Sequence, residues 1–86
     1  MSYSISIKQS AEKSLNSLSD KIHDKIIEKI LTLSDNPRPH QSKKLKAKEY
    51  YRIRSGDYRI LYVIDDSIKS IEIIAADHRK DIYKKR

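Results

Sequence analysis

Cysteine is absent from this chain of 86 residues, which excludes disulfide bonds and thiolate metal sites. The three histidines, His23, His40 and His78, are too scattered to suggest a zinc site. No apolar run approaches the length of a membrane span, and residues 1–8 have neither a long apolar core nor a cleavage site. We therefore expect a cytoplasmic protein that needs no metal or cofactor and has no membrane partner.

Glycine is also scarce, and tryptophan and phenylalanine do not occur. The single glycine, Gly56, marks a turn at Ser55-Gly56-Asp57. We expect five of the tyrosines to supply the aromatic part of the core, namely Tyr3, Tyr50, Tyr51, Tyr58 and Tyr62. A chain of this length forms one domain with a thin core, over residues 1–86, and a partner can add to its stability.

Positive charge is abundant but concentrated. Seven basic residues and one acidic residue lie between positions 37 and 54, and five basic residues and one acidic residue lie between 79 and 86. Two such blocks favour binding to a polyanion, although a single lysine run is more often only a solvated surface. The lysines expected to contact backbone phosphates without reading sequence are Lys43, Lys44, Lys46 and Lys48.

The hydrophobic pattern changes period along the chain. Tyr3, Ile5 and Ile7 alternate with serine, which predicts a strand. Apolar residues then recur at steps of three and four between positions 11 and 33, which predicts helical structure capped at Ser10 and again at Ser19. We expect two helices, ended by the prolines at positions 37 and 39.

The second half reads as a three-stranded antiparallel meander over residues 50–54, 58–64 and 68–75. The strand at 58–64 is apolar on both faces from Ile60 onward, which indicates a central strand. Asp77 is a candidate cap for a short helical tail. The predicted fold is α+β, with an N-terminal strand, a two-helix hairpin, the meander and a short C-terminal tail.

Three motifs in this order resemble the RelE/ParE toxin superfamily. Residues 51–62, YRIRSGDYRILY, resemble its central hairpin, residues 78–83, HRKDIY, resemble its C-terminal motif, and Lys44-Leu45 matches an upstream pair. The order of predicted elements agrees over nearly the whole chain. The resemblance implies the RelE/ParE fold, a cognate antitoxin, a toxin–antitoxin assembly that binds operator DNA, and, for the RelE branch, cleavage of messenger RNA in the ribosomal A site.

RNA cleavage through the 2′-hydroxyl needs groups that clamp the phosphate and groups that move protons. Arginine suits the first task, because its planar fork donates paired hydrogen bonds to phosphate oxygens, and Arg52, Arg54 and Arg59 are the candidates. Arg52 and Arg54 share one face of a strand, although a solvated sheet face has the same alternation. Some RelE toxins have lysines in this first hairpin strand; arginine keeps the clamp but cannot serve as a base.

The C-terminal motif supplies the other candidates. His78 is the acid/base candidate if it faces the phosphate, because histidine titrates near neutral pH, and Arg79 is a further phosphate contact. Tyr83 either stacks on a base, takes part in proton transfer or anchors the tail. Asp77 stands where some RelE relatives have arginine, so the match is looser there.

The geometry of the hairpin decides whether the arginines form one site. A two-residue turn at Gly56-Asp57, or a four-residue loop, places Arg54 opposite Arg59; a three-residue loop turns Arg59 to the other face. We expect the shared face. The rival functions are a ParE-like inhibitor of DNA gyrase without catalysis and a plain nucleic-acid-binding domain.

Overall fold

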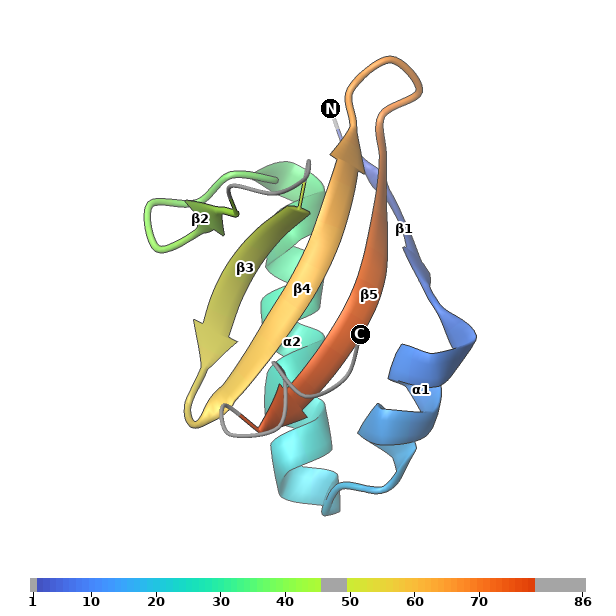
Figure 1. The fold of residues 1–86 in the computed structure, drawn as a ribbon, viewed down its shortest axis with the longest axis vertical. Helices are drawn as coiled ribbons and strands as arrows, with labels where there is room; N and C mark the ends of the chain where they lie inside the picture. Colours follow the sequence, from blue (N-terminus) through green and yellow to red (C-terminus); the bar gives the residue numbers. More distant parts are fainter. Residues whose placement is uncertain (1, 46–49, 79–86) are drawn as a thin grey trace.

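The computed structural model describes residues 2–45 and 50–78, which form a five-stranded sheet with two helices against one face (Figure 1). The elements in chain order are β1 Ser4–Ile7, α1 Gln9–Asn16, α2 Asp20–Asp35, β2 Lys43–Lys44, β3 Tyr50–Ser55, β4 Tyr58–Asp65 and β5 Ser70–His78. The strand order is β1-β5-β4-β3-β2, so β4 is central, as its apolar sequence predicted. The α+β prediction is confirmed, with two additions: β1 pairs parallel with β5, and β2 extends the sheet.

The two helices begin for different reasons. The Ser19 hydroxyl accepts a hydrogen bond from the Ile22 N–H, so the predicted cap of α2 is confirmed. The prediction that Ser10 caps α1 is wrong, because the extended residue before the helix is Lys8. The Lys8 N–H donates to the Ile73 carbonyl at 2.9 Å, so pairing of β1 with β5 continues to the last residue before the helix.

The core lies between the helices and the sheet. It consists of aliphatic residues and one tyrosine, namely Ala11, Leu15, Ile26, Ile30, Leu33, Ile53, Ile60, Tyr62, Ile64, Ile71, Ile73 and Ala76. Tyr62 is fully buried, and its hydroxyl donates to the Pro37 carbonyl at 2.8 Å. Burial raises the pKa of this hydroxyl. Tyr3, Tyr51 and Tyr58 pack against the core as predicted.

The β3–β4 hairpin turns through two residues, Gly56 and Asp57. Ser55 pairs with Tyr58, and Gly56 has a φ of 62°, a conformation that side chains with a Cβ rarely adopt. Of the two turns that would place Arg54 opposite Arg59, the structure has the two-residue one, and it determines the register of every pair in the hairpin.

The β4–β5 hairpin departs from the prediction at both ends of β5. The strand begins at Ser70 rather than Ile68, because residues 66–69 form the turn, Lys69 has a φ of 54°, and Ile68 is 67% exposed. β5 also continues to His78, so Asp77 pairs with Arg59 in the sheet and the prediction that it caps a helix is wrong.

A β-bulge interrupts the pairing of β4 with β5. Leu61 pairs with Ala75 and Tyr62 pairs with Ile73, which leaves Ile74 as the extra residue. The extra residue reverses the alternation of β5. Ala76 consequently joins Ile73 in the core, and Asp77 points to the face of the sheet away from the helices.

Candidate anion-binding site

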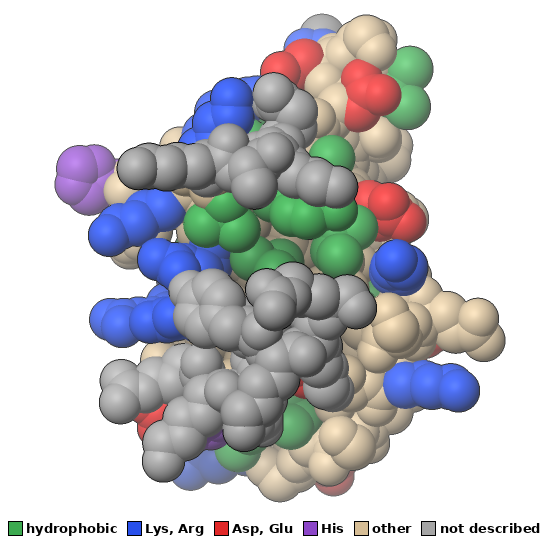
Figure 2. All heavy atoms as spheres, in the orientation of Figure 1, with side chains coloured by type: hydrophobic (Ala, Val, Ile, Leu, Met, Phe, Trp, Pro, Cys, Tyr) green, Lys and Arg blue, Asp and Glu red, His purple; other side chains and the backbone are tan. Residues whose placement is uncertain are grey.

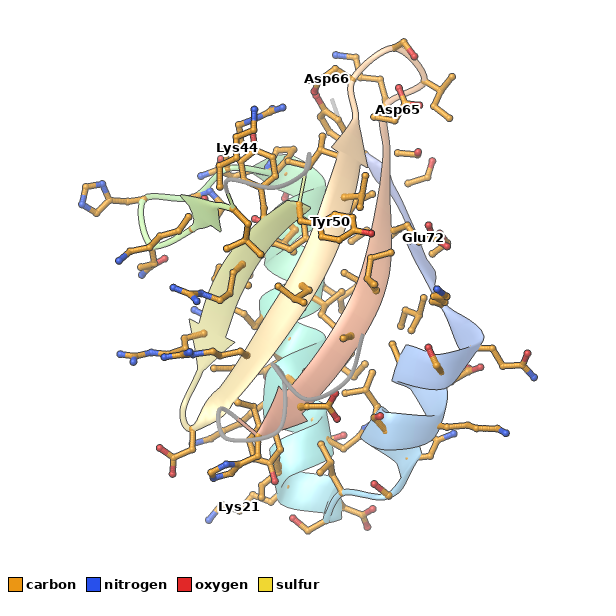
Figure 3. All side chains as sticks on the ribbon, viewed as in Figure 1. Lys21, Lys44, Tyr50, Asp65, Asp66 and Glu72 are labelled. Carbon is orange, nitrogen blue, oxygen red and sulfur yellow. The ribbon has the colours of Figure 1, made fainter. Side chains whose placement is uncertain are left out.

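The face of the sheet away from the helices, called the outer face below, follows from strand alternation. Its residues are Tyr50, Arg52 and Arg54 of β3, Arg59, Leu61 and Val63 of β4, Glu72, Ala75 and Asp77 of β5, and Lys43 of β2. Figure 3 shows Tyr50 over the middle of this face and Glu72 at its β5 side. The prediction that Tyr50 belongs to the core is wrong: its side chain lies on the outer face, opposite to the face that carries Tyr51 and Ile53.

The three candidate arginines share this face. Arg54 lies directly opposite Arg59, and Arg52 lies opposite Leu61. This is the register that the two-residue turn predicted. Directly opposed like charges cost a fraction of a kcal/mol up to about 1 kcal/mol, and a bound anion would remove that cost.

A cavity of about 540 Å³ opens beside the arginines. Its lining is mostly cationic and comes from α2, the loop before β2, strands β2 to β4 and the β3–β4 turn: Lys29, Gln41, Lys43, Arg52, Ile53, Arg54, Gly56 and Arg59. The cavity therefore reaches from the outer face round the edge of β3 to the helical layer. Its size lies in the range of small-molecule sites, about 300 to 1,000 Å³.

Charge and apolar surface are separated across the outer face. Lys and Arg side chains gather on the β2–β3 side, and apolar side chains occupy the middle (Figure 2). Half-buried Leu61, Val63 and Ala75 belong to this apolar area. A ligand that lies across the face would meet anion-binding groups on one side and apolar surface beside them.

Asp77 completes a row of charges across three strands. Arg54 pairs with Arg59, and Arg59 pairs with Asp77, so a carboxylate stands on the far side of Arg59. With about 5 Å between neighbouring strands, the backbones of the three residues lie within about 10 Å. Asp77 is 8% exposed. Simple alternation along β5 would place Asp77 on the core side, and the β-bulge moves it to the outer face.

His78 does not join this row. It pairs with Tyr58, whose neighbour Ile60 lies in the core, so His78 occupies the helix-covered face. Its ring meets the Tyr58 ring edge-on, with 5.5 Å between centroids. The condition attached to its acid/base role, that it face the phosphate, is not met by this register.

The remaining predicted residues divide into two groups. Lys43 pairs with Arg52 and shares the outer face with it. Lys44 pairs with Tyr51, so by strand alternation it belongs to the opposite face, at the edge of the sheet. Both lysines are exposed. The residues that lie outside the described part of the chain are Lys46, Lys48, Arg79 and Tyr83.

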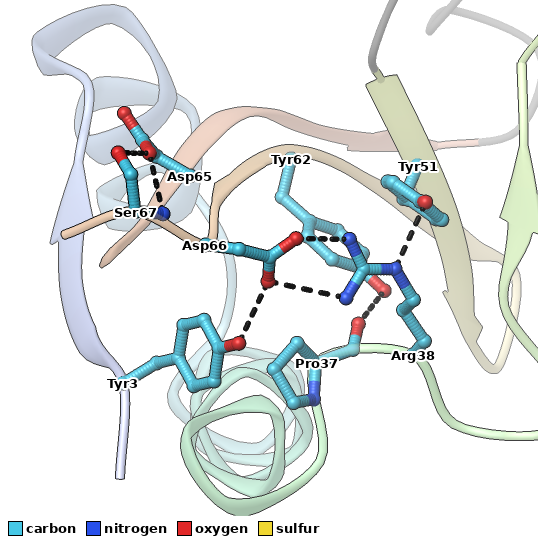
Figure 4. A network of polar contacts seen from close by, with 8 residues as sticks. All are labelled: Tyr3, Pro37, Arg38, Tyr51, Tyr62, Asp65, Asp66 and Ser67. Atoms are coloured by element: carbon cyan, nitrogen blue, oxygen red, sulfur yellow. Dashed lines mark hydrogen bonds and ion pairs between the residues drawn. The ribbon is translucent and has the colours of Figure 1, made fainter. Parts of the chain in front are cut away.

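Arg38, although it belongs to the basic segment 37–54, is neutralised at the other end of the sheet (Figure 4). Its guanidinium donates to both Asp66 carboxylate oxygens, at 2.9 and 3.3 Å, and to the Tyr51 hydroxyl at 3.0 Å. The Tyr3 hydroxyl donates to the same carboxylate at 2.7 Å. The Arg38 bond, and then the Tyr3 bond, lower the pKa of Asp66, and the bond to Asp66 raises the pKa of Tyr3.

Two cavity residues, Lys29 and Gln41, were not predicted as site residues. Lys29 is one of several cations on a helix, and Gln41 follows a proline-rich loop, so neither carries a motif. Within residues 2–45 and 50–78, no cluster of histidine and acidic residues could hold a metal. None of the helices described is long and apolar enough to cross a membrane.

Comparison with known proteins identifies the family. Residues 5–83 match the family model described as the ParE toxin of the type II toxin–antitoxin system parDE. Toxin RelG of Mycobacterium tuberculosis is 31% identical over 87 residues, covering 99% of this chain and 100% of that toxin.

Solved structures agree. The toxin–antitoxin complex RelBE2 from Mycobacterium tuberculosis aligns with a TM-score of 0.82 at 29% identity, covering 92% of this chain and 100% of the other. The RelE–RelB complex from Pyrococcus horikoshii has the same TM-score and identity, covering 92% and 97%. The chain belongs to the RelE/ParE superfamily and is a toxin of a type II toxin–antitoxin system.

Proposed function

We propose that this toxin cleaves messenger RNA on translating ribosomes and that a cognate antitoxin silences it. The observation that supports the proposal best is the pairing of Arg54 with Arg59 on the outer face, beside a cationic cavity. A fold selected for stability alone has no use for two opposed arginines. A site for phosphate transfer does use such a pair, because the phosphate gains negative charge in the transition state and fixed hydrogen-bond donors stabilise that charge.

The proposed reaction is internal transesterification. The 2′-oxygen attacks the adjacent phosphorus, the bond from phosphorus to the 5′-oxygen breaks, and a 2′,3′-cyclic phosphate forms. The 2′-hydroxyl proton passes to a base, and the departing 5′-oxygen takes up a proton. Arg52, Arg54 and Arg59 would hold the nonbridging oxygens, a role worth about 3 to 4 kcal/mol for one well-placed donor.

Arginine cannot take the 2′-hydroxyl proton, and His78 lies on the other face. Among the outer-face residues that the structure describes, Asp77 is the carboxylate beside Arg59, and we assign the proton to it. Arg79 as a phosphate contact and Tyr83 as a base-stacking or proton-transfer group remain parts of the proposal that lie outside the described residues.

The antitoxin and the ribosome are the proposed partners. Both solved relatives above are toxin–antitoxin complexes, and the chain carries a net charge of +7 concentrated in two blocks. An acidic, mostly helical antitoxin segment would complement the basic side of the outer face. Binding of operator DNA by the toxin–antitoxin assembly, and a cytoplasmic location, are part of the same proposal.

The decisive experiment is incubation with programmed ribosomes, followed by mapping of new messenger RNA ends. We expect ribosome-dependent cuts that leave a 2′,3′-cyclic phosphate or the 3′-phosphate derived from it. Cuts that leave only 3′-hydroxyl ends would contradict the mechanism. The rival, inhibition of DNA gyrase without catalysis, is favoured by the ParE family match, and a supercoiling assay with purified gyrase tests it directly.

A further inference from the structure

The cavity beside β3 contains more binding groups than the clamping of one phosphate requires. The three arginines enter it from the outer face, but Lys29 comes from α2, and Gln41 comes from the loop before β2. Lys29 is half-buried, and neither residue belongs to the hairpin motif. The fold therefore extends the cationic surface round a sheet edge that the hairpin alone does not reach.

The backbone at this edge adds a donor. The Leu45 N–H donates to the Tyr50 carbonyl at 2.8 Å, so the backbone groups of Tyr50 point towards β2. Because this direction alternates along a strand, the N–H of Arg54 points the same way. β2 begins at Lys43, opposite Arg52, so it does not extend as far as Arg54. An anion in the cavity can meet this N–H as well as the side chains.

We propose that the cavity is a nucleotide pocket for the RNA strand next to the cleaved bond, with Lys29 and Gln41 as RNA-binding residues. This inference rests on the proposed function. Lys29, Lys43 and the Arg54 N–H would bind the flanking phosphate. The strand would run from the arginines round the edge of β3 towards α2.

Gln41 is assigned to the base. The other polar side chains that line the cavity are cations, which donate hydrogen bonds and suit phosphate. An amide both donates and accepts, so it can pair with the edge of a base. The volume of about 540 Å³ accommodates a nucleotide rather than a bare phosphate.

The test measures binding rather than cleavage. The probe is a short single-stranded RNA with one 2′-deoxyribose at the cleavage position, titrated with toxin at several salt concentrations. Lys29→Gln should weaken binding several-fold at low salt and reduce the slope of log K against log salt by about 0.7, as for one lost phosphate contact on a single strand. Gln41→Ala should leave that slope unchanged and narrow the affinity differences among probes that differ in the base next to the deoxyribose.

Lys25→Gln is the matched control, since Lys25 lies one turn earlier on α2, is exposed and does not line the cavity. We expect it to alter binding much less than Lys29→Gln. Equal losses of RNA affinity in the two variants would overturn the proposed pocket, because they would show that RNA responds only to the net charge of the protein. Melting temperatures of all variants show whether any loss reflects unfolding.

The outcomes separate this inference from the proposed function. Wild-type toxin that cuts messenger RNA on ribosomes, with Lys29→Gln equal to Lys25→Gln in binding, overturns the pocket alone. Toxin that binds the probe with the Lys29-dependent slope but never cuts supports the pocket and overturns the cleavage reaction. If Lys29→Gln weakened binding to ribosomes but not to the isolated probe, the pocket would bind ribosomal RNA. That result would overturn the proposal that it binds messenger RNA.

Discussion

The arginine pair on the outer face makes opposite predictions for two neighbouring substitutions. Arg54 is exposed and lies opposite Arg59, whereas Arg59 also lies opposite Asp77. Arg54→Gln removes one of two directly opposed positive charges and leaves Arg59 opposite Asp77. Arg59→Gln also relieves the opposed charges, but it removes the cation opposite Asp77, whose carboxylate belongs to a residue that is 8% exposed.

The magnitudes are small but measurable. Removing the repulsion between Arg54 and Arg59 should raise the free energy of unfolding by about 0.5 kcal/mol, the middle of the range for like charges opposed across strands. For a chain of this length that is a rise in melting temperature of about 2 to 4 °C. In Arg59→Gln, removing the cation opposite Asp77 should lower the free energy of unfolding by about 1 to 3 kcal/mol, which exceeds the gain. This variant should therefore melt several degrees below wild type.

Thermal unfolding followed by circular dichroism, at low salt and at about 1 M salt, measures both effects. High salt shortens the Debye length to about 3 Å, so the gain from Arg54→Gln should shrink there. Lys25→Gln is the control, because any loss of positive charge stabilises a protein of net charge +7 to some extent. An equal rise for Arg54→Gln and Lys25→Gln, or a fall for Arg54→Gln, would refute the proposed repulsion.

Activity should move against stability. If the opposed arginines bind the phosphate, Arg54→Gln should lower the rate of messenger RNA cleavage about 10²- to 10³-fold while raising the melting temperature. A variant that is more stable and nearly inactive is the expected signature of a site retained at a cost to the fold. A more stable variant with full activity would show that Arg54 is surface charge.

The remaining predictions concern two acidic groups and the antitoxin. Asp77→Asn should bind uncleaved RNA a few-fold more tightly and cut bound RNA about 100-fold more slowly, measured by titration and single-turnover cleavage; unchanged cleavage would remove Asp77 from the reaction. Asp66→Asn should lower the melting temperature at pH 7, because the bond from Arg38 depresses the pKa of Asp66 and stabilises the fold above the unfolded pKa of about 4. That difference should fade as the pH falls through the lowered pKa, and a constant difference would contradict it. Antitoxin binding should slow hydrogen exchange within residues 43–54, and no added protection there or in residues 79–86 would refute the proposed binding of the antitoxin to the basic surface.

Much of the fold could be predicted because local signals agree with tertiary structure. The apolar steps between positions 11 and 33 predict the stripe that becomes the core, and Ser19 begins α2 as expected. The glycine also marked the hairpin turn correctly, but it left the length of the turn open, and the expected register was confirmed only by the structure. Where a short-range rule specifies one geometry, the sequence is sufficient.

Other features depend on contacts between distant segments. β1 pairs with β5 across more than sixty residues, and this pairing, rather than Ser10, determines where α1 begins. β2 has two residues, too few for any periodicity, and exists because β3 offers an edge. Lys29 joins the cavity only because α2 packs behind β3.

The bulge at Ile74 shows how such a contact changes the chemistry of the site. Strict alternation from Ile71 and Ile73 would send Asp77 towards the core and His78 to the outer face, which is the arrangement that an acid/base histidine requires. The extra residue reverses both, so that the carboxylate lies beside Arg59 and the imidazole lies against Tyr58. A single inserted residue thus places a carboxylate rather than an imidazole on the arginine face. In relatives with an arginine at the position of Asp77, the same bulge would add a cation to the row instead. The bulge should therefore be located before any catalytic role is transferred along this strand.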